Sequence, residues 1–443
     1  MALLKNRNFL LLRAGWSISA LGTQLQAFAF SLYILRVTGS AMQFAVTLCL
    51  QIVPTLLMAP FSGYLADRWD RRLQVVLFDL LSGGVTLGFW MLYLGWGRLP
   101  VPAVYVCVFL LAALEQFNSA AAGGLMQQAV PKEDITAQQT VAAVLSNLTS
   151  VGAPALGGIL FGISGLSAAF ACNAASFFAC AVLESRIRLR SRVASGPAAP
   201  FDLRAFGSAQ REAVSYIRHS PFLQSFLTIG AALNFIVVGA DVGLMVAAQK
   251  HYGMSAAWLG AANSAVALGV IAGVLLASAL AGRVERMGLS RMFAATTVFV
   301  AAAFVGSGAL LFWGAGALPT AVDFWLFVSL NAVVAGCCGF DSVHLSSEFM
   351  KRVDPQIIGR TGAFTSAALV SATPLGQVAA GALLSAFPYG VTYFFESALS
   401  GVALLFMEIR RGRSAPGTAE SAIIEHAPLL PHAVSGPERE TGA

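Results

Sequence analysis

Gly63-Tyr64-Leu65-Ala66-Asp67-Arg68-Trp69-Asp70-Arg71-Arg72 is a short polar stretch between two long apolar runs. Its glycine allows two helices to approach closely, and its first aspartate stands at the end of an apolar run, where a helix would end. The arginines would bind acids or lipid phosphates at a membrane surface. Ordinary loop charges explain the arginines but not the order Gly-x-Leu-Ala-Asp-Arg. The stretch therefore predicts a corner between two membrane helices, and its key residues are Gly63, Asp67, Arg68, Arg71 and Arg72.

The composition of the whole chain also indicates a membrane protein. Of the 443 residues, 57% are hydrophobic and 11% are charged, and the mean hydropathy is +0.74. Soluble domains carry roughly one-quarter charged residues, so a soluble core cannot absorb this much apolar surface. The cysteines lie in apolar runs without Cys-x-x-Cys spacing, and we interpret them as packing residues that form no metal or disulfide framework. They are Cys49, Cys107, Cys172, Cys180, Cys337 and Cys338.

The apolar runs predict about twelve membrane helices, because roughly 20 apolar residues are needed to cross about 30 Å of hydrocarbon. The first run is too long for the core of a secretion signal and lacks a clear cleavage site. The predicted spans are Ala14–Leu35, Gln43–Ala66, Leu73–Leu94, Val101–Gln127, Thr136–Gly162, Leu166–Leu183, Phe222–Ala248, Ala256–Leu280, Met292–Trp313, Val322–Leu345, Gly362–Phe387 and Tyr389–Met407.

The distribution of positive charge predicts the orientation of these helices. With both termini in the cytoplasm, only Arg36, Arg98 and Lys250 lie in outer loops, and the other 24 of 27 basic residues lie inside. This agrees with the positive-inside rule, so we expect a multi-pass protein of a bacterial inner membrane. The basic residues are spread over many short loops and form no single stripe. We therefore expect no nucleic-acid partner.

Loop lengths divide the predicted chain into four parts. Residues 1–184 form a first six-helix bundle, and residues 221–409 form a second. Residues 185–220 form a cytoplasmic linker whose later part has a weakly amphipathic pattern, typical of a helix on the membrane surface. Residues 410–443 are polar and without periodicity, which predicts a disordered cytoplasmic tail.

The order of residues 63–72 resembles the signature of the major facilitator superfamily, G-x-L-A-D-R-x-G-R-K, although Asp70 stands where that family usually has glycine. A degenerate counterpart, Leu280–Arg286, follows the eighth predicted helix, where an internal repeat of two six-helix halves would place it. Within the superfamily, Leu4–Phe9 and Asn173–Phe177 are similar to segments of siderophore exporters, such as the enterobactin exporter, and of macrolide-type efflux pumps.

This resemblance implies an all-α fold with twelve transmembrane helices in two pseudo-symmetric six-helix bundles around one central cavity. It implies a secondary active transporter that exports a small amphiphilic molecule, a siderophore or drug-like compound, by alternating access and proton antiport. The expected partners are that substrate, protons and membrane lipids, and the proton gradient is the energy source, so no cofactor is needed. We expect a monomer. A proton-coupled importer and a non-transporting membrane sensor remain alternatives.

The fifth predicted helix carries Pro154, Gly157 and Gly158 in its second half. Proline frees a backbone carbonyl, and glycines let helices approach closely, so a kinked helix is expected. The segment resembles the antiporter motif G-P-x-x-G-G of proton-coupled exporters, with Ala153 in place of its first glycine. A packing kink without any role in direction is the alternative.

Acidic residues inside the predicted spans are the candidates for chemistry, because each costs roughly 2.5–3.5 kcal/mol near a helix centre unless it faces a cavity or a partner. They are Asp79, Glu115, Asp241, Asp341 and Glu396. The resemblance places Glu115, Asp241 and Asp341 on cavity helices. Asp79 is expected to pair with the nearby arginines, and Glu396 has no assigned role.

Polar neighbours at helical spacing extend three of these positions into stripes. Each stripe would face the cavity, and Asp341, His344 and Glu348 would relay a proton toward the cytoplasm. The predicted cavity residues are Gln24, Glu115, Asn118, Asn234, Asp241, Asp341 and His344. The chain lacks the H-E-x-x-H and G-x-S-x-G motifs of membrane hydrolases, so we do not expect an enzyme.

The predicted spans contain no arginine or lysine that would hold a carboxylate-bearing substrate. This favours a neutral, cationic or amphiphilic cargo, in contact with aromatic side chains.

Gating is expected at the corner after the second helix. Asp67 should lie near Gly362, at the N-terminus of the eleventh helix, where unpaired backbone N–H groups favour an anion. Arginines of the same corner should tie the inner side shut by ion pairs that join Arg71 or Arg72 to Glu133 or Asp134.

Overall fold

Twelve long helices make up most of the part of the chain that the computed structural model describes, which is residues 6–131, 134–187, 215, 217–287, 289–314, 318–353 and 358–413. Some side chains within these helices, including those of Asp67, Arg68 and residues 358–364, are not described. Most of the predicted linker helix lies outside the described residues, as does the predicted disordered tail apart from residues 410–413, which form the end of α13. The helices are α1 (Arg7–Thr38), α2 (Ala41–Arg68), α3 (Arg71–Trp96), α4 (Val101–Ala129), α5 (Ile135–Ser164), α6 (Leu166–Ser185), α8 (Pro221–Lys250), α9 (Ala256–Met287), α10 (Leu289–Ala309), which continues as the π-helical segment η3 (Leu310–Gly314), α11 (Thr320–Arg352), α12 (Ile358–Ala386) and α13 (Tyr389–Arg413).

The twelve predicted spans coincide with these helices. Within the described residues, eleven helices are long and apolar enough to cross a membrane, and α13 is the further long helix. Several helices extend beyond the predicted spans: α1 begins at Arg7, whereas the prediction began at Ala14. Hydropathy falls at the first charged residue, but backbone hydrogen bonding continues past it.

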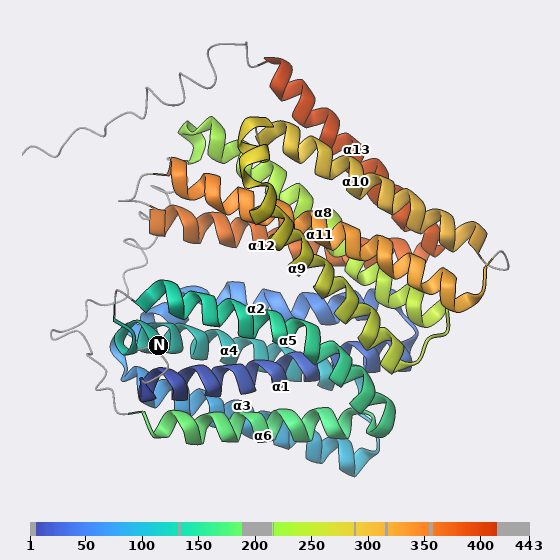
Figure 1. Cartoon of the computed structure of the whole chain (residues 1–443). Helices are drawn as coiled ribbons and strands as arrows, with labels where there is room; N and C mark the ends of the chain where they lie inside the picture. The colour runs from blue at the N-terminus through green and yellow to red at the C-terminus, as the bar shows by residue number, and fades with distance from the viewer. Residues whose placement is uncertain are drawn as a thin grey trace, which may run out of the picture.

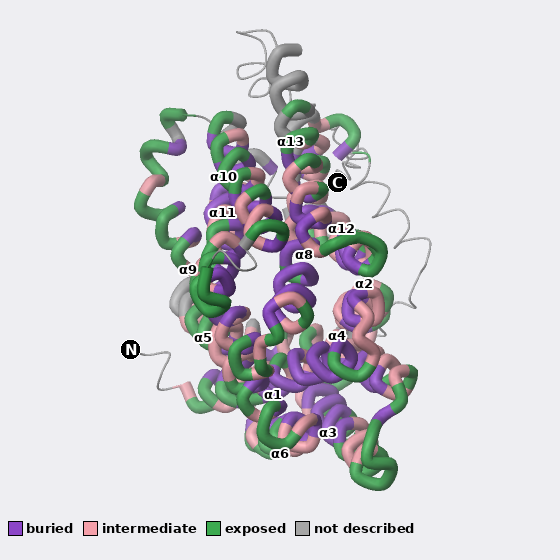
Figure 2. The backbone as a smooth tube through the Cα atoms, turned by 90° about the vertical axis from the view of Figure 1, so that its right-hand side faces the viewer, coloured by how far each residue is buried: buried purple, intermediate pink, exposed green. Residues whose placement is uncertain are grey.

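The helices form two six-helix bundles, one from α1–α6 and one from α8–α13 (Figure 1). In the first bundle α6 packs against α1 and α3, and in the second α13 packs against α8 and α10. Buried residues line the inside of each bundle (Figure 2). Large apolar side chains stay exposed on the outside, among them Leu73, Phe299 and Trp313. A soluble protein would rarely expose so much apolar surface, whereas a bilayer accommodates it.

The corner between α2 and α3 does not need the glycine that the family signature has at its eighth position. Asp70 has φ −60° and ψ 111°, an extended conformation that any residue adopts. Its carboxylate accepts hydrogen bonds from the backbone N–H groups of Arg72 (2.8 Å) and Leu73 (3.2 Å). Asp70 is therefore the N-cap of α3, a position that aspartate favours.

The two bundles meet through α5 with α9 and α2 with α12. We use two names for the ends of the molecule. The linker end is the one where α1 and α8 begin, and the opposite end is the one where these two helices finish. The close contacts lie toward the opposite end: Gly158 faces the Ala256 carbonyl, Gly260 faces the Pro154 carbonyl, and Gly381 faces Ala45. A hydrogen bond from Lys250 Nζ to the Gly39 carbonyl joins the bundles at the same end.

Candidate functional site

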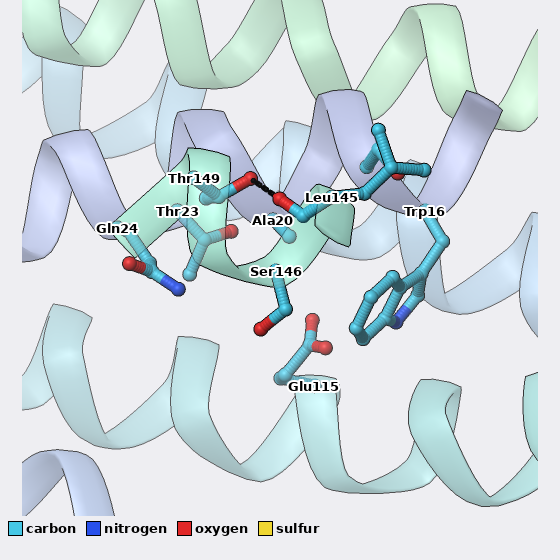
Figure 3. Close-up of a pocket in the computed structure, with 9 residues that line it drawn as sticks. Trp16, Ala20, Thr23, Gln24, Glu115, Leu145, Ser146 and Thr149 are labelled. Carbon is cyan, nitrogen blue, oxygen red and sulfur yellow. Dashed lines mark hydrogen bonds between the residues drawn. The ribbon is translucent and has the colours of Figure 1, made fainter. Parts of the chain in front are cut away.

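A cavity of about 230 Å³ lies inside the first bundle, between α1, α4 and α5. Figure 3 shows Glu115 rising from α4 toward Ser146 of α5, with Trp16 of α1 beside both. We call this cavity the α1–α4–α5 pocket. It is lined by Trp16, Ser17, Ala20, Thr23, Gln24, Glu115, Leu145, Ser146 and Thr149.

The pocket combines one carboxylate with an indole and several small polar groups. Thr149 donates to the Leu145 carbonyl of its own helix at 2.9 Å, so its hydroxyl is occupied (Figure 3). The hydroxyls of Ser17 and Thr23 are buried and have no hydrogen-bond partner among the described residues. Buried hydroxyls without partners are rare, so these two are available to a bound molecule. The lining therefore suits a cargo with an apolar body and a polar or cationic group.

The first predicted span left out a buried basic side chain that lies next to Trp16 of the pocket lining. Arg13 lies within α1, is 7% exposed, and places its guanidinium 4.9 Å from the centre of the Trp16 ring. The prediction missed it because the first span was started one residue too late. The guanidinium thus lies against an indole of the pocket lining, but Arg13 is not itself one of the lining residues, so the expectation of a neutral, cationic or amphiphilic cargo stays a prediction.

Two of the predicted cavity residues, Gln24 and Glu115, line the pocket, but Asn118 does not. The Asn118 amide nitrogen donates to Asp79 Oδ1 at 2.5 Å inside the bundle. Asp79 is 0% exposed, and the partners that the described residues offer it are on α4 and α6, where pairing with the arginines of the α2–α3 corner was expected. The face of α3 that carries Asp79 is turned toward these two helices.

Asp79 meets two residues that the sequence did not single out. One oxygen of Asp79, Cys180 Sγ and one oxygen of Glu184 all lie within 4.8 Å of one another. Glu184 escaped attention because the predicted span ended at Leu183, and Cys180 was interpreted only as a packing residue. The spacing of four residues between Cys180 and Glu184, which places both on one helix face, was the available signal.

The predicted residues of the second bundle lie apart from the pocket. Asn234 donates to the Gly230 carbonyl of its own helix at 2.9 Å, and Asp241 is exposed on α8. Asp341 is 6% exposed and accepts a hydrogen bond from Thr296 of α10 at 3.0 Å. The structure therefore places Asp341 between two helices of its own bundle.

His344 and Glu396 are also buried in the second bundle. His344 is buried, and its ring lies 4.9 Å from that of Phe340. Glu396 is 5% exposed and directs its carboxylate at Gly239 of α8, where any larger residue would collide with it. Because Gly239 has no side chain, α8 leaves room for the carboxylate of Glu396 on α13.

Arg71 and Arg72 of the α2–α3 corner each donate a hydrogen bond to a backbone carbonyl. Arg71 Nε donates to the Ala66 carbonyl at 2.8 Å, and its guanidinium lies against Gly124 of α4. Arg72 donates to the Ser185 carbonyl at the end of α6, where an ion pair with an acid after α4 was expected. Helix carbonyls at C-termini lack partners within the helix and attract cations.

The remaining parts of the predicted gate are only partly described. Nothing lies within 4 Å of the place where a side chain on Gly63 would start. The side chains of Asp67 and Arg68, the region around Gly362 and the whole of Glu133 lie outside the described residues. The expected contact of Asp67 with the start of α12 stays a prediction.

The predicted kink segment of α5 is a packing surface on two sides. A Cβ on Gly157 would lie 3.1 Å from Phe28 Cδ1 of α1, whereas Gly158 faces the other bundle at Ala256. Pro154 lies inside the continuous helix α5 and presents its carbonyl to Gly260 of α9. The segment therefore joins the pocket-bearing bundle to its neighbour.

Known proteins with similar sequences are transporters. The chain is 23% identical over 401 residues to macrolide efflux protein A of Streptococcus pyogenes, which covers 89% of this chain and 93% of that protein. It is 25% identical over 416 residues to the enterobactin exporter EntS of Salmonella choleraesuis, with 91% and 93% covered. A bacterial homologue of the iron transporter ferroportin, solved in an inward-facing state, has the same fold: the TM-score is 0.66 at 19% identity, with 92% of this chain and 98% of that chain covered.

The family model of the Major Facilitator Superfamily matches residues 15–336, from the start of α1 into α11. This match covers most of the chain and agrees with the two six-helix bundles. The chain is accordingly a multi-pass membrane transporter for a small molecule and not an enzyme. It belongs to the Major Facilitator Superfamily.

Proposed function

We propose that this transporter exports a small amphiphilic molecule, a drug-like compound or a siderophore, from a bacterial cell by alternating access and proton antiport. The observation that carries the proposal is the α1–α4–α5 pocket, where Glu115 lies beside Trp16 and unpaired hydroxyls. The names of the similar proteins, macrolide efflux protein A and enterobactin exporter, support export of this kind of cargo.

The arrangement of the bundles supports loading from the cytoplasm. The bundles touch toward the opposite end, through Gly158 and Ala256 among others. The positive-inside rule assigns the linker end, with most of the basic residues, to the cytoplasm. In this state the pocket would be reached from inside the cell. Separation of α5 from α9 would then open it to the outside.

Exchange of a proton for cargo follows from a single acid in the pocket. While Glu115 is ionised it favours a cationic or hydrogen-bond-donating group of the cargo, and the indole of Trp16 provides apolar contact. A proton that reaches Glu115 from outside removes the charge and weakens the bound state. Cargo and proton therefore occupy Glu115 alternately, which is the requirement for antiport.

The size of the pocket limits what is held in this state. Sites for drug-sized ligands have volumes of roughly 300–1,000 Å³, whereas this cavity measures about 230 Å³. A large cargo would therefore place only one group in the pocket and lie between the bundles with the rest. Trp16 and Gln24 would be the residues closest to that group.

The test uses the purified protein in liposomes with an imposed pH gradient and a panel of dye, macrolide and siderophore cargoes. We expect cargo to move against the proton gradient, and Glu115→Gln to lose this coupled movement while retaining exchange of labelled for unlabelled cargo. Ser119→Ala is the matched control, because Ser119 is on the same helix and exposed. Movement of cargo together with protons would indicate an importer, and no movement of any cargo would indicate a sensor; either result overturns the proposal.

A further inference from the structure

Asp79 of α3 and Cys180 and Glu184 of α6 form a second buried cluster in the first bundle, distinct in its residues from the pocket. One side-chain ligand atom from each of the three residues lies within 4.8 Å of the other two. Their exposed fractions are 0%, 1% and 1%. Cys180 and Glu184 are four residues apart on one face of α6, and α3 packs directly against that helix (Figure 1). The cluster thus bridges two helices.

The cluster has oxygen atoms that no described group satisfies. Asp79 Oδ1 accepts the hydrogen bond from Asn118, which fixes the orientation of the carboxylate. Asp79 Oδ2 and Glu184 Oε2 are both buried and lack a hydrogen-bond partner among the described residues. Buried carboxylate oxygens are costly unless a donor or a cation faces them. Two of them beside a thiol indicate that a positively charged ligand belongs between them.

The types of donor atom select the class of cation. Mg²⁺ and Ca²⁺ prefer sites made wholly of oxygen, and a sulfur ligand disfavours them. A set of one sulfur and two carboxylate oxygens suits Zn²⁺ and similar divalent transition metals. Ligand atoms around tetrahedral Zn²⁺ lie about 3.3–3.8 Å apart, so small side-chain rotations would bring this cluster to that geometry.

We propose that Asp79, Cys180 and Glu184 bind a divalent transition metal of the Zn²⁺ class and thereby join α3 to α6. The Asn118 amide, bonded to Asp79, would position the carboxylate toward the metal. Glu184 is the second-to-last residue of α6, so the metal would enter from the linker end. The site shares no residue with the α1–α4–α5 pocket.

The experiment titrates Co²⁺ into the metal-free, full-length protein in detergent and records the thiolate-to-cobalt charge-transfer absorbance. We expect one Co²⁺ per chain, displaced by Zn²⁺ and not by Mg²⁺. Cys180→Ser should remove the band, whereas Cys107→Ser should retain it, because Cys107 is equally buried but is not one of the clustered ligands. Asp79→Asn and Glu184→Gln should each weaken binding at least about tenfold.

A second measurement, the melting temperature, distinguishes loss of metal binding from misfolding of a variant. At one Zn²⁺ concentration, the melting temperature should rise in the wild-type protein and in Cys107→Ser, and should rise less in Glu184→Gln. Absence of the band in wild-type protein, or an equal band in Cys180→Ser, overturns the proposal. An equal rise in melting temperature on addition of Zn²⁺ to wild type and to Glu184→Gln also overturns the proposal. None of these readings requires transport, so they fail or succeed separately from the proposed export.

Discussion

Each bundle joins a pair of neighbouring helices by a hydrogen bond to a buried acid, but the acid is on the first helix of the pair in one bundle and on the second helix in the other. In the first bundle α3 and α4 are joined by the bond from Asn118 to Asp79, and in the second α10 and α11 are joined by the bond from Thr296 to Asp341. These are corresponding helix pairs if the halves are related by an internal repeat. The first bundle adds Glu115 and Glu184 around its pair.

A second pair of corresponding helices shows the same contrast. Where α6 packs against α1, Asn173 donates to Gln26 at 2.6 Å between two amides. Where α13 packs against α8, the Glu396 carboxylate lies against Gly239. The second bundle adds a bond of 3.5 Å from the Tyr393 hydroxyl to the Ala240 carbonyl, which is longer than the amide bond of the first bundle. Under the proposed function, this contrast and the pocket assign cargo binding to the first bundle, with the second as the surface against which it closes.

The largest expected effect tests that division directly. Glu115→Gln should lower gradient-driven export by roughly a hundredfold or more, the loss typical when a residue that carries a proton is removed. Asp341→Asn should lower it much less, because Asp341 accepts a bond from Thr296 and does not line the pocket. The measurement is the initial rate of export in proteoliposomes with matched protein content. Equal losses in the two variants would show that the bundles share the coupling, and full export by both would exclude either acid as the proton carrier.

The next effect concerns the contact between the bundles. A side chain on Gly158 would run into the Ala256 carbonyl, so Gly158→Leu should disfavour the observed state by an amount near the upper end of about 1–3 kcal/mol. Labelling of cysteines placed near the ends of α5 and α9 would then increase at the opposite end. Gly162→Leu is the control, because nothing lies within 4 Å of that position on the same helix. Similar labelling of both variants would argue against close packing at Gly158.

A smaller effect is expected for the amide pair between α1 and α6. Asn173→Ala should destabilise the protein by about 1–3 kcal/mol, because it leaves the buried Gln26 without its donor. Asn234→Ala should cost less than about 0.5 kcal/mol, since Asn234 is half-buried and bonds only to its own helix. Thermal unfolding in one detergent compares the two. If Asn234→Ala were the more destabilising, the first bundle would not be the more tightly bonded one.

The smallest effect is expected at the exposed tie between Lys250 and the Gly39 carbonyl. Lys250→Gln should change the balance between the two states by less than about fivefold, because exposed charged contacts contribute little. Arg36→Gln, on the exposed end of α1, should change it even less. The same cysteine-labelling assay measures both. A change in Lys250→Gln as large as that in Gly158→Leu would make this tie a principal part of the closure.

The sequence predicted the helices well because hydropathy depends only on the order of residues. It also placed Gln24 and Glu115 in one pocket, because the family resemblance assigned both of their helices to the cavity. It did not place Asp79 or Asn118 correctly. Both lie on helices that were predicted, but which way a side chain points depends on the rotation of each helix against its neighbours. That rotation is set by side-chain packing across the bundle.

Two features at the starts of helices also have local causes. Arg13 was left out of the first span because charged residues lower the window average, yet the helix includes it and Trp16 covers its charge. Asp70 departs from the family signature, and the structure shows that an N-cap replaces the glycine at that corner. Neither result follows from hydropathy, because both depend on where a helix starts.

The contact between α5 and α9 has a consequence for how fast the protein turns over. It is made largely of backbone and very small groups: Gly158 against the Ala256 carbonyl, Gly260 against the Pro154 carbonyl, and Ser264 donating to the Val151 carbonyl at 2.6 Å. Few rotamers are frozen when such a surface closes, and little apolar area is lost when it parts, so the entropy and hydration changes on each cycle are small. In the alternating access proposed above, the barrier to rocking would then be set by the rest of the molecule, and the two bundles would part and rejoin without repacking their interiors.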